Sequence, residues 1–323
     1  MACDGSNLTI APNLNDPETL WKSNQLGATG NHLHLNALYD VLNRTYIDAL
    51  VQTASMYQEH RACIQMIERV TLDKVILIAD RGYENYNIMS HAIEKGWKFL
   101  IRIKDVHSNG IASGLELPQT AVFDMDINLI LTRNQTKSKK QAGYKFMPTV
   151  QTFDYLPIGS KEDYPISFRI ARFKIADDSY ETVITNLDRF CFSAEKLKEL
   201  YHLRWGIETS FRELKYAIGL TSFHAKKVDY IKQEIFARLT LYNYCELITT
   251  YVVEHTENIS KKNQVNFTIA IYICREYLRR KRKLRPPDVV KLIEKHILPI
   301  RPGRRDPRKV KPQASVSFLY RVA

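Results

Sequence analysis

One short segment constrains the fold of this 323-residue chain more than any other. The run from Lys74 to Ala79 is apolar after its first residue, rich in β-branched side chains, and ends at Asp80. Such a run is typical of a strand that is buried on both faces of a sheet. Helical spacing flanks it at Tyr57–Val70 and at Glu84–Lys95, and Gly96 closes the second segment. A buried strand between two helices predicts an α/β fold.

Further strands are expected on either side of this segment. His32–Val41 and Arg44–Gln52 are strand-like runs joined at Asn43, which indicates a hairpin, and Trp97–Ile103 returns to strand. The order hairpin, helix, buried strand, helix, strand predicts a mixed α/β sheet.

A β-rich stretch is predicted from about Val106 to Asp188. Its strand-like runs are broken by Gly, Pro and Asn, and a basic loop, Lys137–Lys140, lies among them. Ser193 is a typical N-cap residue and Glu195 would lie in the first turn, so a long helix is predicted from there to Ile218. The runs within the β-rich stretch are Ile127–Thr132, Ile166–Ile175 and Glu181–Thr185.

The sequence after Gly219 is predicted to be mostly helical and carries nearly all of the excess charge. From Arg275 to Lys311 there are fifteen Lys or Arg and four acidic residues, a net charge of +11 out of +12 for the chain. A polyanion is the natural partner, because each neutralised phosphate releases a counterion. No amphipathic helix with an aromatic insertion face accompanies the run, which favours nucleic acid over anionic lipid. The expected helices are Asp229–Thr250, Asn266–Lys283 and Pro287–His296, followed by an extended tail.

Composition excludes several classes of protein. Apolar residues at 45% and charged residues at 25% are globular values, which exclude a disordered or fibrous chain. No apolar run approaches the roughly 18 residues of a membrane span, and the first residues lack a signal peptide. The five scattered cysteines form no C-x-x-C pair, which argues against a disulfide framework or a zinc site. A soluble cytoplasmic protein is expected.

The most specific pattern lies in the predicted long helix, where four functional side chains share one face. Their offsets fall within a stripe roughly 60° wide, so that a carboxylate would lie among groups that bind phosphate oxygens. A carboxylate in this setting binds a hard cation. The alternative is a solvated face with an Arg204–Glu208 ion pair, against which the tyrosine and the expected core residues Trp205, Ile207 and Phe211 count. The four residues are Tyr201, Arg204, Glu208 and Lys215.

Two further segments place acids at positions suited to chemistry. Asp80 follows the buried strand, at the sheet edge where ligand groups collect in open α/β folds. An Asp at that place can also simply cap the next helix. Cys3-Asp4-Gly5-Ser6 places another acid near the N-terminus.

Taken together, these segments resemble the bacterial DDE transposases of the insertion-sequence-four type. The spacing Y-x2-R-x3-E-x6-K is similar to that family's signature. Asp4-Gly5-Ser6 looks like its first catalytic block and Ala79–Tyr83 like its second. Arg301-Pro-Gly-Arg304-Arg305 is similar to its basic C-terminal motif, so the resemblance covers nearly the whole chain.

The resemblance implies an α/β fold: an RNase H-like mixed sheet with a β-rich insertion and a mostly helical, basic C-terminal region. The implied domains are the first part of the catalytic core at 1–105 and the insertion at 106–190. The core helix with the third acid would follow at 191–222, and the basic C-terminal region at 223–323.

The resemblance also implies a reaction and its residues. Asp4, Asp80 and Glu208 would form a catalytic triad that binds two divalent cations, Mg²⁺ or Mn²⁺. The chain would cut DNA at transposon ends and transfer the freed strand into target DNA, as a dimer in the paired-end complex. Its partners would be double-stranded DNA and a second copy of itself, at the bacterial nucleoid and not at a membrane. The implied phosphate-binding residues are Tyr201, Arg204, Lys215, Arg301, Arg304 and Arg305.

One feature departs from the family pattern. Only Met1–Cys3 precede Asp4, whereas the relatives have a DNA-binding region and an apolar first strand before this block. The N-terminus is therefore expected to be truncated, with a first strand that is too short and Asp4 poorly anchored. The alternatives to an active transposase are an inactive DNA-binding remnant, another two-metal nuclease such as a junction resolvase, and a lipid-surface protein.

Overall fold

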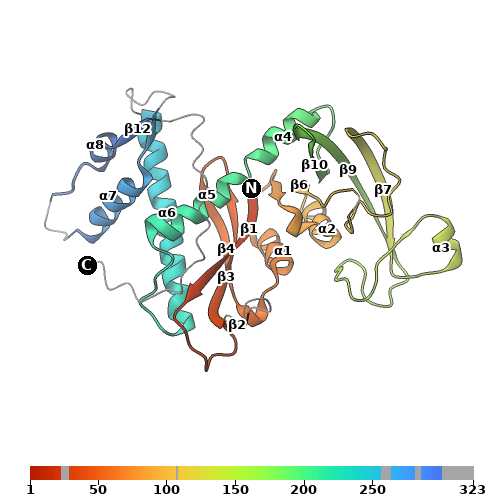
Figure 1. The fold of residues 1–323 in the computed structure, drawn as a ribbon, viewed down its shortest axis with the longest axis horizontal. Coiled ribbons are helices and arrows are strands. Elements are labelled where there is room, and N and C mark those ends of the chain that lie inside the picture. Colours follow the sequence, from red (N-terminus) through yellow and green to blue (C-terminus); the bar gives the residue numbers. More distant parts are fainter. Residues whose placement is uncertain (23–28, 107, 256–262, 281–284, 300–323) are drawn as a thin grey trace. The chain divides into compact units, whose positions relative to one another are not determined.

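The computed structural model describes the chain except for residues 23–28, 107, 256–262, 281–284 and 300–323. The chain divides into two units, whose elements are coloured along the sequence in Figure 1. The first unit comprises Met1–Asp4, Asn36–Tyr39 and Gln58–Trp205. The second comprises Gly5–Leu35, Asp40–Tyr57 and Gly206–Ala323.

A mixed sheet forms the centre of the first unit. β1 (Ala2–Ile10) enters this unit with its first residues and pairs in parallel with β5 (Ile76–Ala79). β5 pairs in parallel with β6 (Lys98–Arg102), and β10 (Ser179–Thr185) pairs antiparallel with β6. The sheet continues from β10 through β9 (Asp163–Ala176), β7 (Phe123–Thr132) and β8 (Lys145–Phe146).

Helices cover both faces of this sheet. Leu77 and Ala79 of β5 belong to the same buried cluster as residues of α1 (Glu59–Arg69) and α2 (Tyr86–Glu94). Ile78, between them, packs instead with Leu197 and Tyr201 of α4 (Ala194–His202). Because successive side chains of a strand point to opposite faces, β5 is buried on both sides, as the sequence predicts.

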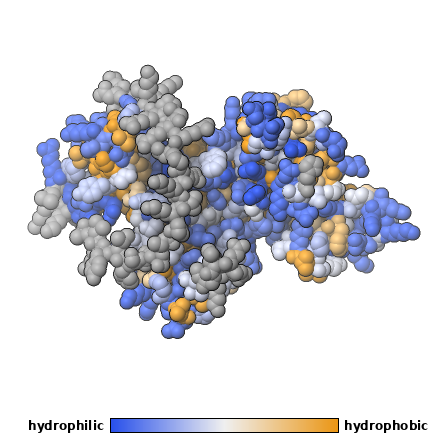
Figure 2. Space-filling model, viewed as in Figure 1, coloured by the Kyte–Doolittle hydropathy of each residue, from blue (hydrophilic) through white to orange (hydrophobic). Residues whose placement is uncertain are grey.

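The inserted strands β7, β9 and β10 form a long antiparallel ladder within the first unit. α3 (Lys137–Gln141) follows β7 and lies beyond its end in Figure 1. Thr136 caps this helix by accepting a hydrogen bond from the backbone N–H of Lys139. The prediction that Lys137–Lys140 form a loop is therefore wrong, since an N-cap threonine suffices to start a short helix there. Figure 2 shows hydrophilic residues over this part of the insertion.

The second unit combines strands with most of the C-terminal helices. β3 (Thr29–Asp40) and β4 (Thr45–Thr53) form a hairpin, and β2 (Leu20–Lys22) pairs with β3. α6 (Val228–His255) is the longest helix among the described residues. The other elements are α5 (Trp205–Glu213), a π-helical turn (Leu214–Ile218), β11 (Asn263–Val265), α7 (Phe267–Arg279), α8 (Val289–Glu294) and β12 (Ile297–Pro299).

The predicted α/β class with a mixed sheet is confirmed. The hairpin β3–β4, then α1, β5, α2 and β6, occur in the predicted order, and β7 to β10 form the predicted β-rich stretch. The boundaries proposed at 105, 190 and 222 stay predictions. Within the described residues, no helix combines the length and the apolar character that a membrane crossing requires.

The predicted long helix from Ser193 to Ile218 is wrong. Ser193 does cap α4, but the chain leaves regular helix at Leu203 and Arg204, where each backbone N–H bonds to the carbonyl three residues earlier. α5 begins at Trp205, and its last turn widens into a π-helix. The break coincides with the burial of Arg204 against Asp4, a contact between distant residues that helical spacing cannot reveal.

The first strand also differs from its prediction. β1 runs from Ala2 to Ile10, so that Asp4 lies inside a nine-residue strand and not after a truncated one. Ala2 and Cys3 are completely buried, and they pair with Ile78 and Ala79. Asp4 is therefore anchored on both sides by strand residues, since pairing continues the strand through the polar block.

Gly219 provides a test of the turn that ends the π-helix. Its φ is 90°, and its backbone N–H bonds to the carbonyl of Leu214. An alanine Cβ would meet no described atom within 4 Å, so only the left-handed backbone opposes it. Gly219→Ala is expected to lower the free energy of unfolding by about 1 kcal/mol, as measured by urea denaturation.

Gly30→Ala is the matched control for this substitution. Gly30 lies in β3 of the same unit, has no left-handed φ, and would place its Cβ at an ordinary 3.6 Å from His32. It should change the free energy of unfolding little. Equal losses in the two variants would show that the backbone conformation at Gly219 is not the cause.

Candidate functional site

Asp4 and Asp80 lie next to each other on neighbouring strands. Ala2 pairs with Ile78 and Cys3 with Ala79, so the same parallel register brings Asp4 beside Asp80. Neighbouring strands lie about 4.8 Å apart. Cys3 and Ala79 are buried in the cluster on the α1 and α2 side, so the alternation of side chains directs both acids to the opposite face. The fold thus brings together two residues that are 76 positions apart.

Asp80 caps the turn that follows it, which the sequence had left as one alternative, and it uses one carboxylate oxygen to do so. Its backbone is extended, and its Oδ1 accepts a hydrogen bond of 2.8 Å from the N–H of Gly82. This bond caps the start of the 3-10 turn Arg81–Tyr83. Because a carboxylate has two oxygens, capping is compatible with a second contact through Oδ2.

His60 of α1 is hydrogen-bonded to the same turn. Its Nε2 donates to the carbonyl of Gly82 at 2.6 Å, and its Nδ1 accepts from the Asn85 amide at 3.2 Å. A carbonyl only accepts hydrogen bonds, so the contact with Gly82 requires the proton on Nε2. Asn85 also caps α2 by accepting from the N–H of Asn87. The turn after Asp80 is thereby tied to both α1 and α2.

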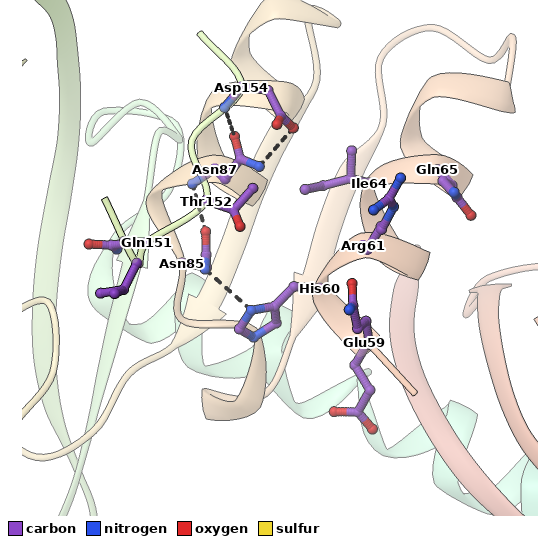
Figure 3. Close-up of a pocket in the computed structure, with 12 residues that line it drawn as sticks. Glu59, His60, Arg61, Ile64, Gln65, Asn85, Asn87, Gln151, Thr152 and Asp154 are labelled. Atoms are coloured by element: carbon purple, nitrogen blue, oxygen red, sulfur yellow. Dashed lines mark hydrogen bonds between the residues drawn. The ribbon is translucent and has the colours of Figure 1, made fainter. Parts of the chain in front are cut away.

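A polar cavity of about 720 Å³ opens beside this turn in the first unit. Figure 3 shows His60, Arg61 and Gln65 on one side and Asn85 and Gln151 on the other. Amide side chains dominate the lining, and they can donate as well as accept hydrogen bonds. The other lining residues are Gln58, Glu59, Ile64, Asn87, Val150, Thr152 and Asp154.

Arg204 lies beside Asp4 in the first unit. Its Nη1 lies 3.9 Å from Oδ2 of Asp4, and the side chains are 7% and 22% exposed. The guanidinium also lies over the rings of Tyr201 and Trp205, at 5.6 and 5.2 Å from their centroids. A buried guanidinium beside a carboxylate neutralises part of its charge. Glu208 was the partner of Arg204 considered from the sequence, and the structure shows an ion pair of Arg204 with Asp4.

Tyr201 and Trp205 differ from the expected arrangement. Tyr201 is buried, and burial raises the pKa of its phenol above the usual value, with the charge of Arg204 acting in the opposite direction. Trp205 is 47% exposed, so its prediction as a core residue is wrong. Regular helix is interrupted at Leu203 and Arg204, so the four residues of the pattern do not belong to one continuous α-helix.

Glu208 and Lys215 belong to the second unit. Glu208 lies in the first turn of α5 and is partly exposed. Lys215 lies in the π-helical turn, and burial lowers the pKa of its ammonium group. Arg301, Arg304 and Arg305 lie outside the described residues. The catalytic role of Glu208 and the phosphate-binding roles of these residues stay predictions.

An acidic pair in the second unit, with Glu246 buried and Glu213 half-buried, was not expected from the sequence. Glu213 of α5 and Glu246 of α6 both accept from the hydroxyl of Tyr242, at 3.0 and 3.2 Å. Arg44 donates to Glu246 at 2.9 Å and lies 3.9 Å from Glu213. Burial raises the pKa of both carboxyl groups, and the charge of Arg44 opposes it. Glu246 is the only charged residue between Leu239 and Val253 of α6, and this was the available signal.

The acid pair Asp4 and Asp80 has the chemistry of a site for a hard divalent cation. Carboxylate oxygens are the ligands that Mg²⁺ and Mn²⁺ prefer, and Asp80 keeps one oxygen beyond its cap. Within the part of the chain that the structure describes, no group of three or more His, Cys, Asp or Glu side chains is close enough to hold a metal ion. The pair therefore fits a cation as a partial ligand set.

A match to a known protein family shows to which family the chain belongs. The family model of the transposase DDE domain matches residues 1–244. The chain belongs to this family. The predicted membership among bacterial DDE transposases of insertion sequences is confirmed, and DDE transposases generally use divalent metal ions.

Two known proteins resemble this DDE transposase domain. A protein of Geobacillus stearothermophilus, named "Probable transposase for insertion sequence element IS5377", is 23% identical over 178 residues. The match covers 54% of this chain and 40% of that protein, so the chain spans less than half of that relative's length. The piggyBac transposase, solved as a synaptic complex with hairpin DNA, matches with a TM-score of 0.49 and 10% identity. That match covers 94% of this chain and 59% of the piggyBac chain.

Gly82→Ala tests whether Asp80 contributes to cation binding by the DDE domain. The added Cβ would lie 3.0 Å from Oδ1 of Asp80, closer than an ordinary contact, so the carboxylate must shift. We expect Mn²⁺ affinity, measured by electron paramagnetic resonance, to fall about tenfold, with the thermal midpoint nearly unchanged. In an Asp80→Ala background the methyl group has no carboxylate to displace. The same loss on adding Gly82→Ala there would show that the methyl acts elsewhere.

Proposed function

We propose that this chain is a transposase that cuts DNA at the ends of an insertion sequence and joins the freed strand to target DNA. The observation that carries the proposal is the pairing of β1 with β5, which sets Asp4 beside Asp80 with Arg204 next to them. Membership of the transposase DDE family supports the same function.

The metal ligands in this proposal are Asp4, Asp80 and Glu208, with Mg²⁺ or Mn²⁺ as the cation and two ions in all. Divalent cations at such a site lower the pKa of bound water and stabilise charge on the leaving oxygen. Asp80 holds its carboxylate through Gly82, and strand pairing holds Asp4, so these two acids are oriented before any cation binds. Preorganisation of this kind avoids reordering ligands during the reaction.

Arg204 serves as the phosphate-facing cation of the site. Its guanidinium is buried beside Asp4, where low polarity strengthens its attraction for an anion. It would orient a DNA phosphate by donating two parallel hydrogen bonds. We assign the same class of contact to Tyr201 and Lys215, and to Arg301, Arg304 and Arg305 beyond the described residues.

Double-stranded DNA is the proposed partner, both as transposon end and as target. The net charge of +11 between Arg275 and Lys311 supplies a long-range attraction for it. A dimer of the chain would hold two ends together in the working complex.

Substitution of the acids tests the proposed reaction. Asp4→Ala, Asp80→Ala and Glu208→Ala should each reduce Mn²⁺-dependent cleavage of a duplex carrying the element's end by at least about 10³-fold, because each removes a metal ligand. Gel electrophoresis of labelled DNA measures the cleavage, and a mobility-shift assay should show nearly unchanged DNA binding.

Asp177→Ala is the control for the loss of one carboxylate. Asp177 is fully exposed and pairs only at the surface with Lys174 among the described residues, so cleavage should persist. Wild-type cleavage by Asp80→Ala would refute the assigned triad. DNA binding without any cleavage by the wild-type chain would instead identify a DNA-binding remnant.

The basic C-terminal region can be tested through salt dependence. The affinity for DNA should fall linearly on a logarithmic scale as salt rises, with a slope proportional to the number of neutralised phosphates. Replacing Arg301, Arg304 and Arg305 by Ala should reduce the slope by about one for each lost phosphate contact. Fluorescence anisotropy at several salt concentrations measures this. An unchanged slope would remove these three residues from the DNA interface.

A further inference from the structure

The hydroxyl of Tyr46 links the hairpin to α5 inside the second unit. Tyr46 lies in β4 and is buried, and its hydroxyl lies 2.6 Å from Oγ of Ser210. Ser210 Oγ donates in turn to the carbonyl of Ile207 at 2.7 Å. A hydroxyl has a single proton, so Ser210 must accept from Tyr46. The chain of donors therefore runs from Tyr46 through Ser210 to the backbone of α5.

The main chain of Tyr46 is itself held by α6. Its N–H donates to Oδ1 of Asn243 at 2.8 Å, and its carbonyl accepts from Nδ2 of the same amide at 2.8 Å. Both bonds form with one orientation of the amide only, so the side chain of Asn243 is fixed. Tyr46 thus connects α6 to α5 through a route in which each step is a hydrogen bond of ordinary length.

A second attachment holds the end of α5. Glu213, its last residue, shares the hydroxyl of Tyr242 with Glu246, and Arg44 reaches both carboxylates. Arg44 is the last residue of the hairpin turn, and its φ of 57° is a left-handed conformation that costs energy for a residue other than glycine. Surrounding contacts must stabilise such a conformation, which indicates that the position of this guanidinium is specified by the fold.

The bonds to Ser210 and to Glu213 hold one face of α5, and Glu208 lies on the opposite face. At 100° per residue, Ile207, Ser210 and Glu213 fall on one face, and Glu208 projects about 160° away from Ser210. Glu208 lies between Ile207 and Ser210, in the helical turn that the Ser210–Ile207 hydrogen bond spans. The rotation and the height of α5, and with them the direction of Glu208, therefore depend on this network.

We propose that Tyr46 is a positioning residue for Glu208, acting through Ser210 and held by Asn243. The proposal rests on the proposed function, in which Glu208 is a metal ligand. Tyr46 itself contacts neither metal nor DNA in this role. Its hydroxyl fixes the rotation and the height of α5, and so the direction in which Glu208 presents its carboxylate.

Tyr46→Phe tests the proposal by removing one oxygen atom. The ring should remain in place, because it packs edge-on against Tyr242 and at a tilt against Phe211, at centroid distances of 5.1 and 6.2 Å. Ser210 keeps its bond to Ile207, so no buried donor loses its acceptor. We expect the dissociation constant for Mn²⁺, measured by electron paramagnetic resonance without DNA, to rise about tenfold.

Three further measurements separate positioning from a general structural effect. Saturating Mn²⁺ should restore most of the cleavage rate of Tyr46→Phe, and its affinity for DNA should match the wild type. Ser210→Ala should weaken Mn²⁺ binding similarly, and the double variant should lose no more than either single variant, because both break one chain of hydrogen bonds. Tyr272→Phe removes an exposed hydroxyl of the same unit and should bind Mn²⁺ as the wild type does.

The outcomes distinguish this inference from the proposed function. Wild-type Mn²⁺ affinity in Tyr46→Phe, alongside lost affinity in Glu208→Ala, would overturn the positioning role and leave the triad intact. Wild-type Mn²⁺ affinity in Glu208→Ala would overturn the assignment of Glu208 as a ligand, and the positioning role with it. Additive losses in the double variant would show that Tyr46 and Ser210 act separately, against the proposed chain.

Discussion

The parallel pairing of β1 with β5 is the interaction on which the candidate site depends. The backbone of Met1 already takes part, since its amino group donates to the carbonyl of Ile76 and its carbonyl accepts from Ile78. A shift of this register by one residue would turn every side chain of β1 to the opposite face, and Asp4 would enter the apolar cluster around Cys3. The burial of Ala2 and Cys3 thus specifies where the carboxylate of Asp4 points.

Local periodicity was sufficient to predict the mixed α/β sheet, because the elements concerned are defined by their own burial patterns. The run before Asp80 reads as a doubly buried strand, and it is one. The break between α4 and α5 could not be predicted in this way. It accompanies an ion pair between Arg204 and Asp4, which are 200 positions apart. The sequence from Ser193 to Ile218 itself has the spacing of one continuous helix. Tertiary contacts override local propensity at such a place.

The candidate site was predictable in part for the same reason. Asp4 and Asp80 could be singled out from their segments, and their proximity follows from strand order and register. The network around Glu246 could not be assembled from the sequence, because its partner Arg44 lies 202 positions away on a hairpin turn. A glutamate in an apolar helix shows only that some partner must exist, since an unpaired buried carboxylate is too costly.

Polar side chains also hold the part of the insertion that contains no helix or strand. Residues 147–157 contain no helix or strand, yet Arg133 donates to the carbonyls of Met147, Gln151 and Leu156 and so satisfies groups that a strand would have paired. Asp154 accepts from Asn87 and from His91 of α2, and these bonds hold the pKa of its carboxyl below the usual value against the effect of burial. Because α2 begins directly after the turn that follows Asp80, this helix holds both the turn and the part of the cavity wall that Asp154 forms.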